Sequence, residues 1–154
     1  MATSTACAIM KGERPYILEW VAYYRILGFD RIVIYSNDSS DDSDQILAKL
    51  ASLGVIRYVA WPSGARASPQ LDAYADAVAR CDTDWILFVD ADEFLLLHEH
   101  RSVSEFLAAF PPDVSGIAVN WRLSGRAALP NRMGAWSSIA LDWPRMRSAI
   151  PISM

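Results

Sequence analysis

The chain has little cysteine, and this scarcity excludes two classes of small protein. Its 154 residues contain only Cys7 and Cys81. Two cysteines cannot build a disulfide framework, and by themselves they cannot supply the four ligands of a structural zinc site. We therefore expect both to be small buried hydrophobic residues in a reducing, cytoplasmic setting.

Long apolar runs, excess positive charge and two common nucleotide motifs are also missing. No stretch approaches the roughly 18 apolar residues of a membrane span, and the N-terminus has no signal-peptide pattern. The net charge of −4 argues against a nucleic-acid-binding surface. Neither G-x-G-x-x-G nor G-x-x-x-x-G-K-[ST] occurs, so a P-loop is excluded and a dinucleotide fold has no direct support.

What the chain does have is a regular alternation of apolar runs and helical periodicities up to residue 123. With 53% hydrophobic residues, it can bury the core of one ordinary domain. Strands that alternate with helices predict an α/β fold, with a mostly parallel central sheet and helices on both faces. We expect strands at 6–10, 31–35, 55–60, 85–89 and 116–121, and helices at 15–28, 46–53, 68–80 and 102–110.

The most informative stretch is an apolar run, 85–89, that ends in Asp90, Asp92 and Glu93. Carboxylates are costly to bury, so this strand is expected to end at a cleft. Strand alternation places Asp90 and Asp92 on one side, where a hard divalent cation with oxygen ligands would relieve their repulsion. The alternative is a solvated acidic turn. Glu93 is expected to pair locally.

Polar residues also follow the first two expected strands. The segment 36–44 carries four acids, more than capping of the next helix requires, and acids there suit hydroxyl or N–H donors of a ligand. Glu13 follows the first strand. It can serve as an acid near a helix N-terminus or as a residue facing the cleft, and the sequence leaves both roles open.

The composition changes near residue 122. Before it there are 17 acids and 9 bases, whereas from Arg122 onward there are 5 arginines and one acid, Asp142. No period of 2 or 3.6 is sustained after residue 123, so we predict one regularly folded unit at 1–123 and an irregular tail at 124–154.

Four stretches carry a family resemblance over roughly residues 6–123. The chain resembles glycosyltransferases of the GT-A fold, specifically a family 2-like bacterial group. The order and spacing of the stretches make the likeness specific. They are KGERPYILEW at 11–20, YSNDSSDDS at 35–43, FVDADEF at 88–94 and VNWR at 119–122.

The resemblance implies a sugar transferase that uses a nucleotide-diphosphate sugar and Mn²⁺ or Mg²⁺, with 1–123 as its nucleotide-sugar-binding domain. Asp90 and Asp92 correspond to the D-x-D pair, which holds the metal, and Asp90 also engages the nucleotide. The acceptor, a glycan, lipid or protein, is not implied. Relatives take their acceptor site and catalytic base from a later region that 124–154 does not match, so we name no base and expect a truncated or altered C-terminus. The other nucleotide-binding positions implied are Glu13, Asn37, Asp38 and Asp41.

Two other functions are compatible with parts of the pattern. One is a nucleotide-sugar or partner-binding module without activity. The other is a haloacid-dehalogenase-like phosphatase, which also places D-x-D after an apolar strand. Its motif usually follows the first strand and continues into Thr or Val, whereas here it follows the fourth and continues into Glu93 and Phe94.

Overall fold

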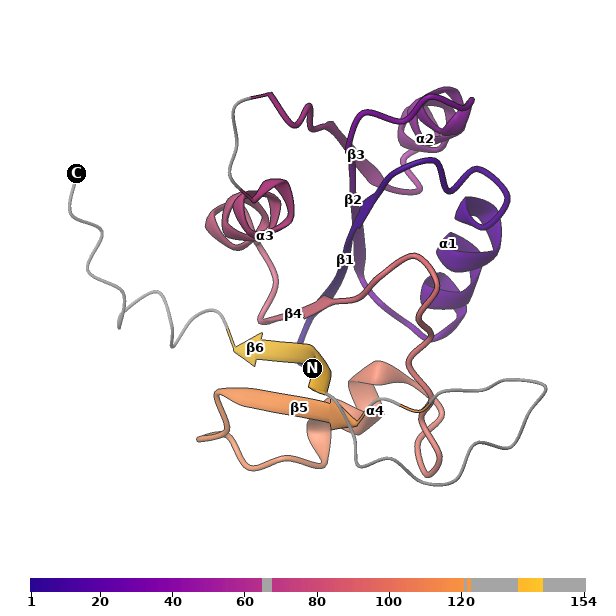
Figure 1. The fold of residues 1–154 in the computed structure, drawn as a ribbon. Coiled ribbons are helices and arrows are strands. Elements are labelled where there is room, and N and C mark those ends of the chain that lie inside the picture. The colour runs from indigo at the N-terminus through magenta and orange to yellow at the C-terminus, as the bar shows by residue number, and fades with distance from the viewer. Residues whose placement is uncertain (65–67, 121, 123–135, 143–154) are drawn as a thin grey trace.

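A single six-stranded sheet, with the order β3-β2-β1-β4-β6-β5, runs through the molecule (Figure 1). The computed structural model describes residues 1–64, 68–120 and 122, and the backbone of 136–142. Its strands are β1 (Ser4–Met10), β2 (Arg31–Ser36), β3 (Arg57–Ala60), β4 (Trp85–Phe88), β5 (Gly116–Asn120) and β6 (Trp136–Asp142). Its helices are α1 (Ile17–Ile26), α2 (Ser43–Ser52), α3 (Pro69–Ala79) and α4 (Val103–Ala108).

Four of the strands are parallel. β1 lies at the centre of this group and pairs with β2 on one side and β4 on the other, while β3 pairs with β2. The β1 strand is almost entirely buried, as expected for a parallel strand covered on both faces.

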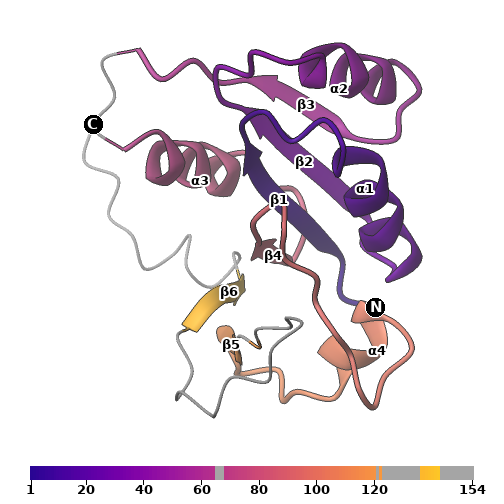
Figure 2. The ribbon, with the colours of Figure 1, turned by 45° about the vertical axis from the view of Figure 1, so that its right-hand side comes forward.

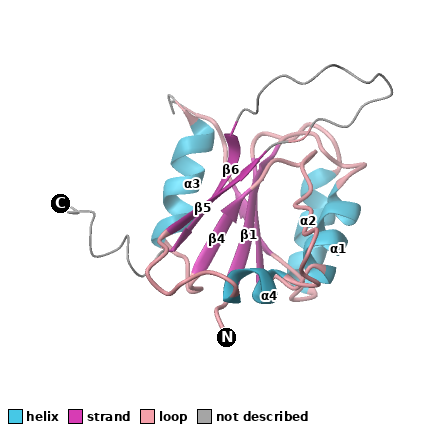
Figure 3. Ribbon diagram, turned by 90° about the horizontal axis from the view of Figure 1, so that it is seen from below, coloured by secondary structure: helices cyan, strands magenta, loops and turns pink. Residues whose placement is uncertain are grey.

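Helices cover both faces of the sheet. Figures 1 and 3 show α3 on one face and α1 and α2 on the other, and Figure 2 shows β1, β2 and β3 side by side between them. Alternate side chains of a strand point to opposite faces of the sheet and join different parts of the core. Ala6, Ala8 and Met10 join the cluster beneath α1, while Cys7 and Tyr35 join the cluster that includes α3. The predicted α/β fold is therefore confirmed.

The first helix begins later than its sequence pattern predicts. Pro15 suits a first helical position, yet α1 starts at Ile17. The backbone amides of Tyr16 and Ile17 both donate to the carbonyl oxygen of Glu13, so the chain makes a tight turn before the helix.

The prediction of an irregular segment after residue 123 is wrong for 136–142. β6 lies between β4 and β5 and is antiparallel to both. Its sequence, WSSIALD, has no clear alternation, and pairing with two neighbours decides the strand. The rest of 124–154 lies outside the described residues, and a domain boundary at residue 123 stays a prediction.

In the described part of the chain, no helix combines the length and apolar character needed to cross a bilayer.

Candidate functional site

The carboxyl ends of the four parallel strands meet at one edge of the sheet. This edge of an open α/β sheet is the usual place for a ligand. The loops that leave it are 11–16 after β1, 37–42 after β2, 61–64 after β3 and 89–102 after β4. All residues that the sequence analysis proposed for the site lie in these loops, so the topology brings them to the same edge.

The acidic turn after β4 is folded by its own members. The amide of Glu93 donates to the carbonyl oxygen of Asp90 at 3.2 Å. In return, the amide of Asp90 donates to the Oε2 atom of Glu93 at 3.1 Å. The expected local pairing of Glu93 is confirmed. Asp90 and Asp92 are both exposed to solvent.

The electrostatics of this turn favour a bound cation. Partial desolvation and the neighbouring charge of Asp92 raise the pKa of Asp90, and a hydrogen bond from Tyr74 opposes this only in part. The ion pairs seen among the described residues join Arg14 to Asp42, Arg31 to Asp82 and Arg80 to Asp76, so none of them neutralises Asp90 or Asp92.

These two carboxylates fit a hard divalent cation. Carboxylate oxygens are the ligands that Mg²⁺ and Mn²⁺ prefer, and Mg²⁺ typically takes only one or two from the protein. Within the described ranges, no group of three or more His, Cys, Asp or Glu side chains could hold a metal ion. An ion at this turn would therefore complete its coordination with a bound molecule and water.

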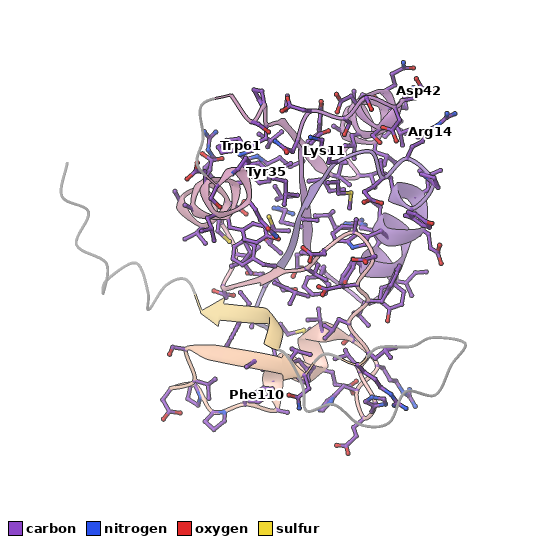
Figure 4. The ribbon with its side chains drawn as sticks, in the orientation of Figure 1. Lys11, Arg14, Tyr35, Asp42, Trp61 and Phe110 are labelled. Carbon is purple, nitrogen blue, oxygen red and sulfur yellow. The ribbon has the colours of Figure 1, made fainter. Side chains whose placement is uncertain are left out.

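The turn after β2 is tied to the loop after β3. Asn37 donates from Nδ2 to the carbonyl oxygen of Trp61 at 2.8 Å and to the Oγ atom of Ser63 at 2.9 Å. Asp38, whose backbone has a φ of 49°, accepts the amide of Ser63 at 2.9 Å. Hydrogen bonds from Ser63 lower the pKa of Asp38. The side chains of Asn37 and Asp38 thus hold the loops after β2 and β3 together. Figure 4 shows Trp61, from the loop after β3, close to Tyr35 on the α3 side.

The same turn is also tied to the loop after β1. Asp41 accepts the amide of Arg14 at 3.1 Å, and Arg14 pairs with Asp42 at 3.1 Å, as Figure 4 shows near the start of α2. Asp41 also accepts the amide of Ser43, the first residue of α2, at 3.1 Å, while the N-cap position itself is Asp42. Hydrogen bonds from Ser43 are the main reason that the pKa of Asp41 is lowered.

Glu13 lies between β1 and α1 and is partly exposed. It is at the carboxyl end of β1 and close to the start of α1, so this position is compatible with both of its predicted roles.

The acidic turn and the turn with Asn37 lie on opposite sides of β1. Because β1 separates β2 from β4, the two turns are two strand spacings apart, about 10 Å. One elongated ligand at this edge could contact both.

Four residues at this site were missed by the sequence analysis. Gln70 donates from Nε2 to the Oδ1 atom of Asp90 at 3.3 Å, and it also donates to the hydroxyl of Tyr74. Tyr74 packs against Phe88 with ring centroids 4.3 Å apart, and it also forms a hydrogen bond with Asp90. The other two missed residues, Trp20 and Tyr24, contact the acidic turn from α1. No periodic signal reveals such contacts, because they depend on how the helices dock.

Two solved structures share the fold at low sequence identity. The mannosyltransferase PcManGT from Pyrobaculum calidifontis, in complex with GDP-Man and Mn²⁺, has a TM-score of 0.57 and 16% identity, covering 75% of this chain and 34% of that one. S. aureus TarS 1-349, in complex with UDP-GlcNAc, has a TM-score of 0.50 and 18% identity, covering 70% and 30%. The fold is therefore that of the GT-A glycosyltransferases.

Plant proteins of known family are similar in sequence. A family 92 protein of Oryza sativa is 26% identical over 133 residues, which is 82% of this chain and 22% of the rice protein. One from Ricinus communis is 33% identical over 93 residues, which is 59% of this chain and 16% of that protein. The chain thus spans about a fifth of the length of these relatives. The assignment to a family 2-like bacterial group is not confirmed. The model of glycosyltransferase family 92 matches residues 7–139, and the chain belongs to that family.

Proposed function

We propose that the chain forms the donor-binding half of a metal-assisted glycosyltransferase, which moves a sugar from a nucleotide-diphosphate sugar to an acceptor. The observation that carries this proposal is the pair Asp90 and Asp92. They reach solvent at the ligand-binding edge of the sheet, and the described ion pairs leave them without an arginine partner.

In this proposal Asp90 and Asp92 hold Mn²⁺ or Mg²⁺, and Asp90 also contacts the nucleotide. The bound ion would neutralise the diphosphate and stabilise it as a leaving group. The Mn²⁺ and GDP-Man of PcManGT and the UDP-GlcNAc of TarS support this choice of metal and donor.

The turns beside the acidic pair would receive the nucleoside. Asp38 is exposed, and a carboxylate has about four acceptor positions, so beyond its bonds from Ser63 it can accept from a ribose hydroxyl. Asn37 and Asp41 would shape this subsite through the loops that they hold together. Glu13 would close it from the turn after β1. No catalytic base is proposed.

The test is a calorimetric titration of the chain with UDP-, GDP- and dTDP-sugars, with and without Mn²⁺. We expect at least one donor to bind only when metal is present. Asp92→Asn should weaken that binding at least about tenfold, since it removes a charged ligand. The matched control Asp113→Asn changes an exposed acid in the loop before β5 and should bind as the wild type does. No metal-dependent binding of any donor would contradict the proposal.

A nucleotide-sugar- or partner-binding module without activity is the second candidate, because no catalytic base is assigned among the described residues. Release of free sugar, or its transfer to an added acceptor, would separate the two. Metal-dependent binding without either product favours the module. The family 2-like affiliation, the use of Mg²⁺ and the cytoplasmic setting stay predictions.

A further inference from the structure

We propose that Trp20 and Tyr24 of α1 are positioning residues, which hold the acidic turn in the orientation that binds metal and nucleotide. This inference rests on the proposed function. It concerns two buried side chains that do not themselves reach the ligand edge.

The two side chains bind the backbone of the acidic turn. Trp20 donates from Nε1 to the carbonyl oxygen of Asp90 at 3.1 Å. The hydroxyl of Tyr24 donates to the carbonyl oxygen of Glu93 at 3.1 Å and accepts the amide of Leu95 at 3.2 Å. The neighbouring Tyr23 also donates to the carbonyl oxygen of Leu95 at 2.7 Å, so four backbone groups of the turn and its continuation are paired with α1.

These partners are themselves fixed in place. Trp20 and Tyr24 are fully buried. They lie one helical turn apart on the same face of α1, with ring centroids 4.4 Å apart. Tyr24 also packs edge-to-face on Phe29 at 5.5 Å. Burial raises the pKa of Tyr24 further above physiological pH, where a tyrosine hydroxyl is already neutral and able to donate.

The turn needs an external support. Residues 89–102 contain no helix or strand, so their backbone groups must find partners elsewhere. The hydrogen bonds described within the turn itself join Asp90 and Glu93. Asp90 and Asp92 repel each other, and a loosely held turn would relieve this repulsion by opening.

Asp90 shows how the support acts on the site. Its carbonyl oxygen is held by Trp20 on one side of the sheet, while its Oδ1 atom accepts from Gln70 on α3. The orientation of this peptide determines where the carboxylate points. Loosening the turn from α1 should therefore move the metal ligands without removing them.

The test compares two tyrosines that each lose only a hydroxyl. Tyr24→Phe removes both bonds to the turn. Tyr35→Phe is the matched control, because Tyr35 is also fully buried and its hydroxyl donates to Asp76 on α3 at 2.8 Å, away from the turn. Amide hydrogen exchange of 89–97, urea unfolding, and donor binding with and without Mn²⁺ are measured for both.

We expect Tyr24→Phe to speed exchange in 89–97 and to weaken Mn²⁺-dependent binding about three- to tenfold, which corresponds to the loss of one or two hydrogen bonds. Tyr35→Phe should destabilise the chain similarly and change neither readout. If Tyr24→Phe only destabilises, as the control does, the inference is overturned. If the wild type binds no donor, the proposed function fails, and unchanged exchange in Tyr24→Phe would overturn the positioning role separately.

Discussion

Gln70 on α3 donates a hydrogen bond from Nε2 to the Oδ1 atom of Asp90 across 3.3 Å. The bond joins the helix on one face of the sheet to the acidic turn at its edge. Together with the hydrogen bond from Tyr74, it restrains the carboxylate of a proposed metal ligand from outside its own loop.

Replacing Gln70 should therefore weaken metal-dependent binding without unfolding the chain. We expect Gln70→Leu to raise the dissociation constant of the Mn²⁺–nucleotide complex about threefold to tenfold, because one hydrogen bond to a charged group is lost. Gln45→Leu is the control. It removes an exposed bond of the same length, from Nε2 to Asp42, on α2. Equal effects of the two variants in the calorimeter would contradict a specific role for Gln70.

Asp90→Asn should stabilise the chain at neutral pH and abolish metal-dependent binding. Partial desolvation and the charge of Asp92 raise the pKa of Asp90, so its ionised form is disfavoured by the folded state. Asparagine removes this penalty and can still accept from Gln70. The gain should be below about 1 kcal/mol because the residue is exposed. Urea unfolding at pH 7 with a chelator present measures it.

Asp38→Asn should change the stability of the chain in the opposite direction to Asp90→Asn. Hydrogen bonds from Ser63 lower the pKa of Asp38, so its ionised form is favoured by folding, and its replacement should lower the urea midpoint. If Asp90→Asn and Asp38→Asn both lower the urea midpoint, the opposite pKa shifts of Asp90 and Asp38 are contradicted.

Asp41→Ala should destabilise the chain in a way that depends on pH. Hydrogen bonds from Ser43 and Arg14 lower the pKa of Asp41. Its ionised carboxylate therefore contributes fully to folding stability above the pKa of an ordinary aspartate, about 4. This contribution is lost as the pH falls through the lowered value. The difference in urea midpoint between Asp41→Ala and the wild type should therefore be larger at pH 7 than at pH 3. An equal difference at both pH values would show that the contribution of Asp41 does not depend on its charge.

The two thiols should differ in reactivity. Cys7 is fully buried in β1, and desolvation strongly raises its pKa, whereas Cys81 is only partly buried. Because the thiolate is the reactive form, Cys81 should react with a disulfide reagent in the native chain and Cys7 only after unfolding. The thiolate that the reagent releases is measured with and without urea, and we expect one equivalent per native chain and two per unfolded chain. If both thiols react rapidly without urea, the burial of Cys7 is contradicted.

Local pattern determined most of the parallel half of the fold. Long apolar runs such as Trp85–Phe88 must be buried on both faces, and the acids that follow them must leave the core. The sequence therefore indicated both the sheet and the edge at which Asp38 and Asp90 lie. An acid that accepts an amide at the start of a helix, as Asp41 does, is also expected just before α2.

Only the tertiary structure decided the contacts between elements distant in sequence. The strand WSSIALD has no alternation that marks it, and it is a strand because β4 and β5 pair with its backbone. Gln70 and Tyr24 reach the acidic turn because α3 and α1 dock on opposite faces beside it. Hydrophobic periodicity specifies which face of a helix is buried, but not which distant backbone or carboxylate its polar atoms will meet.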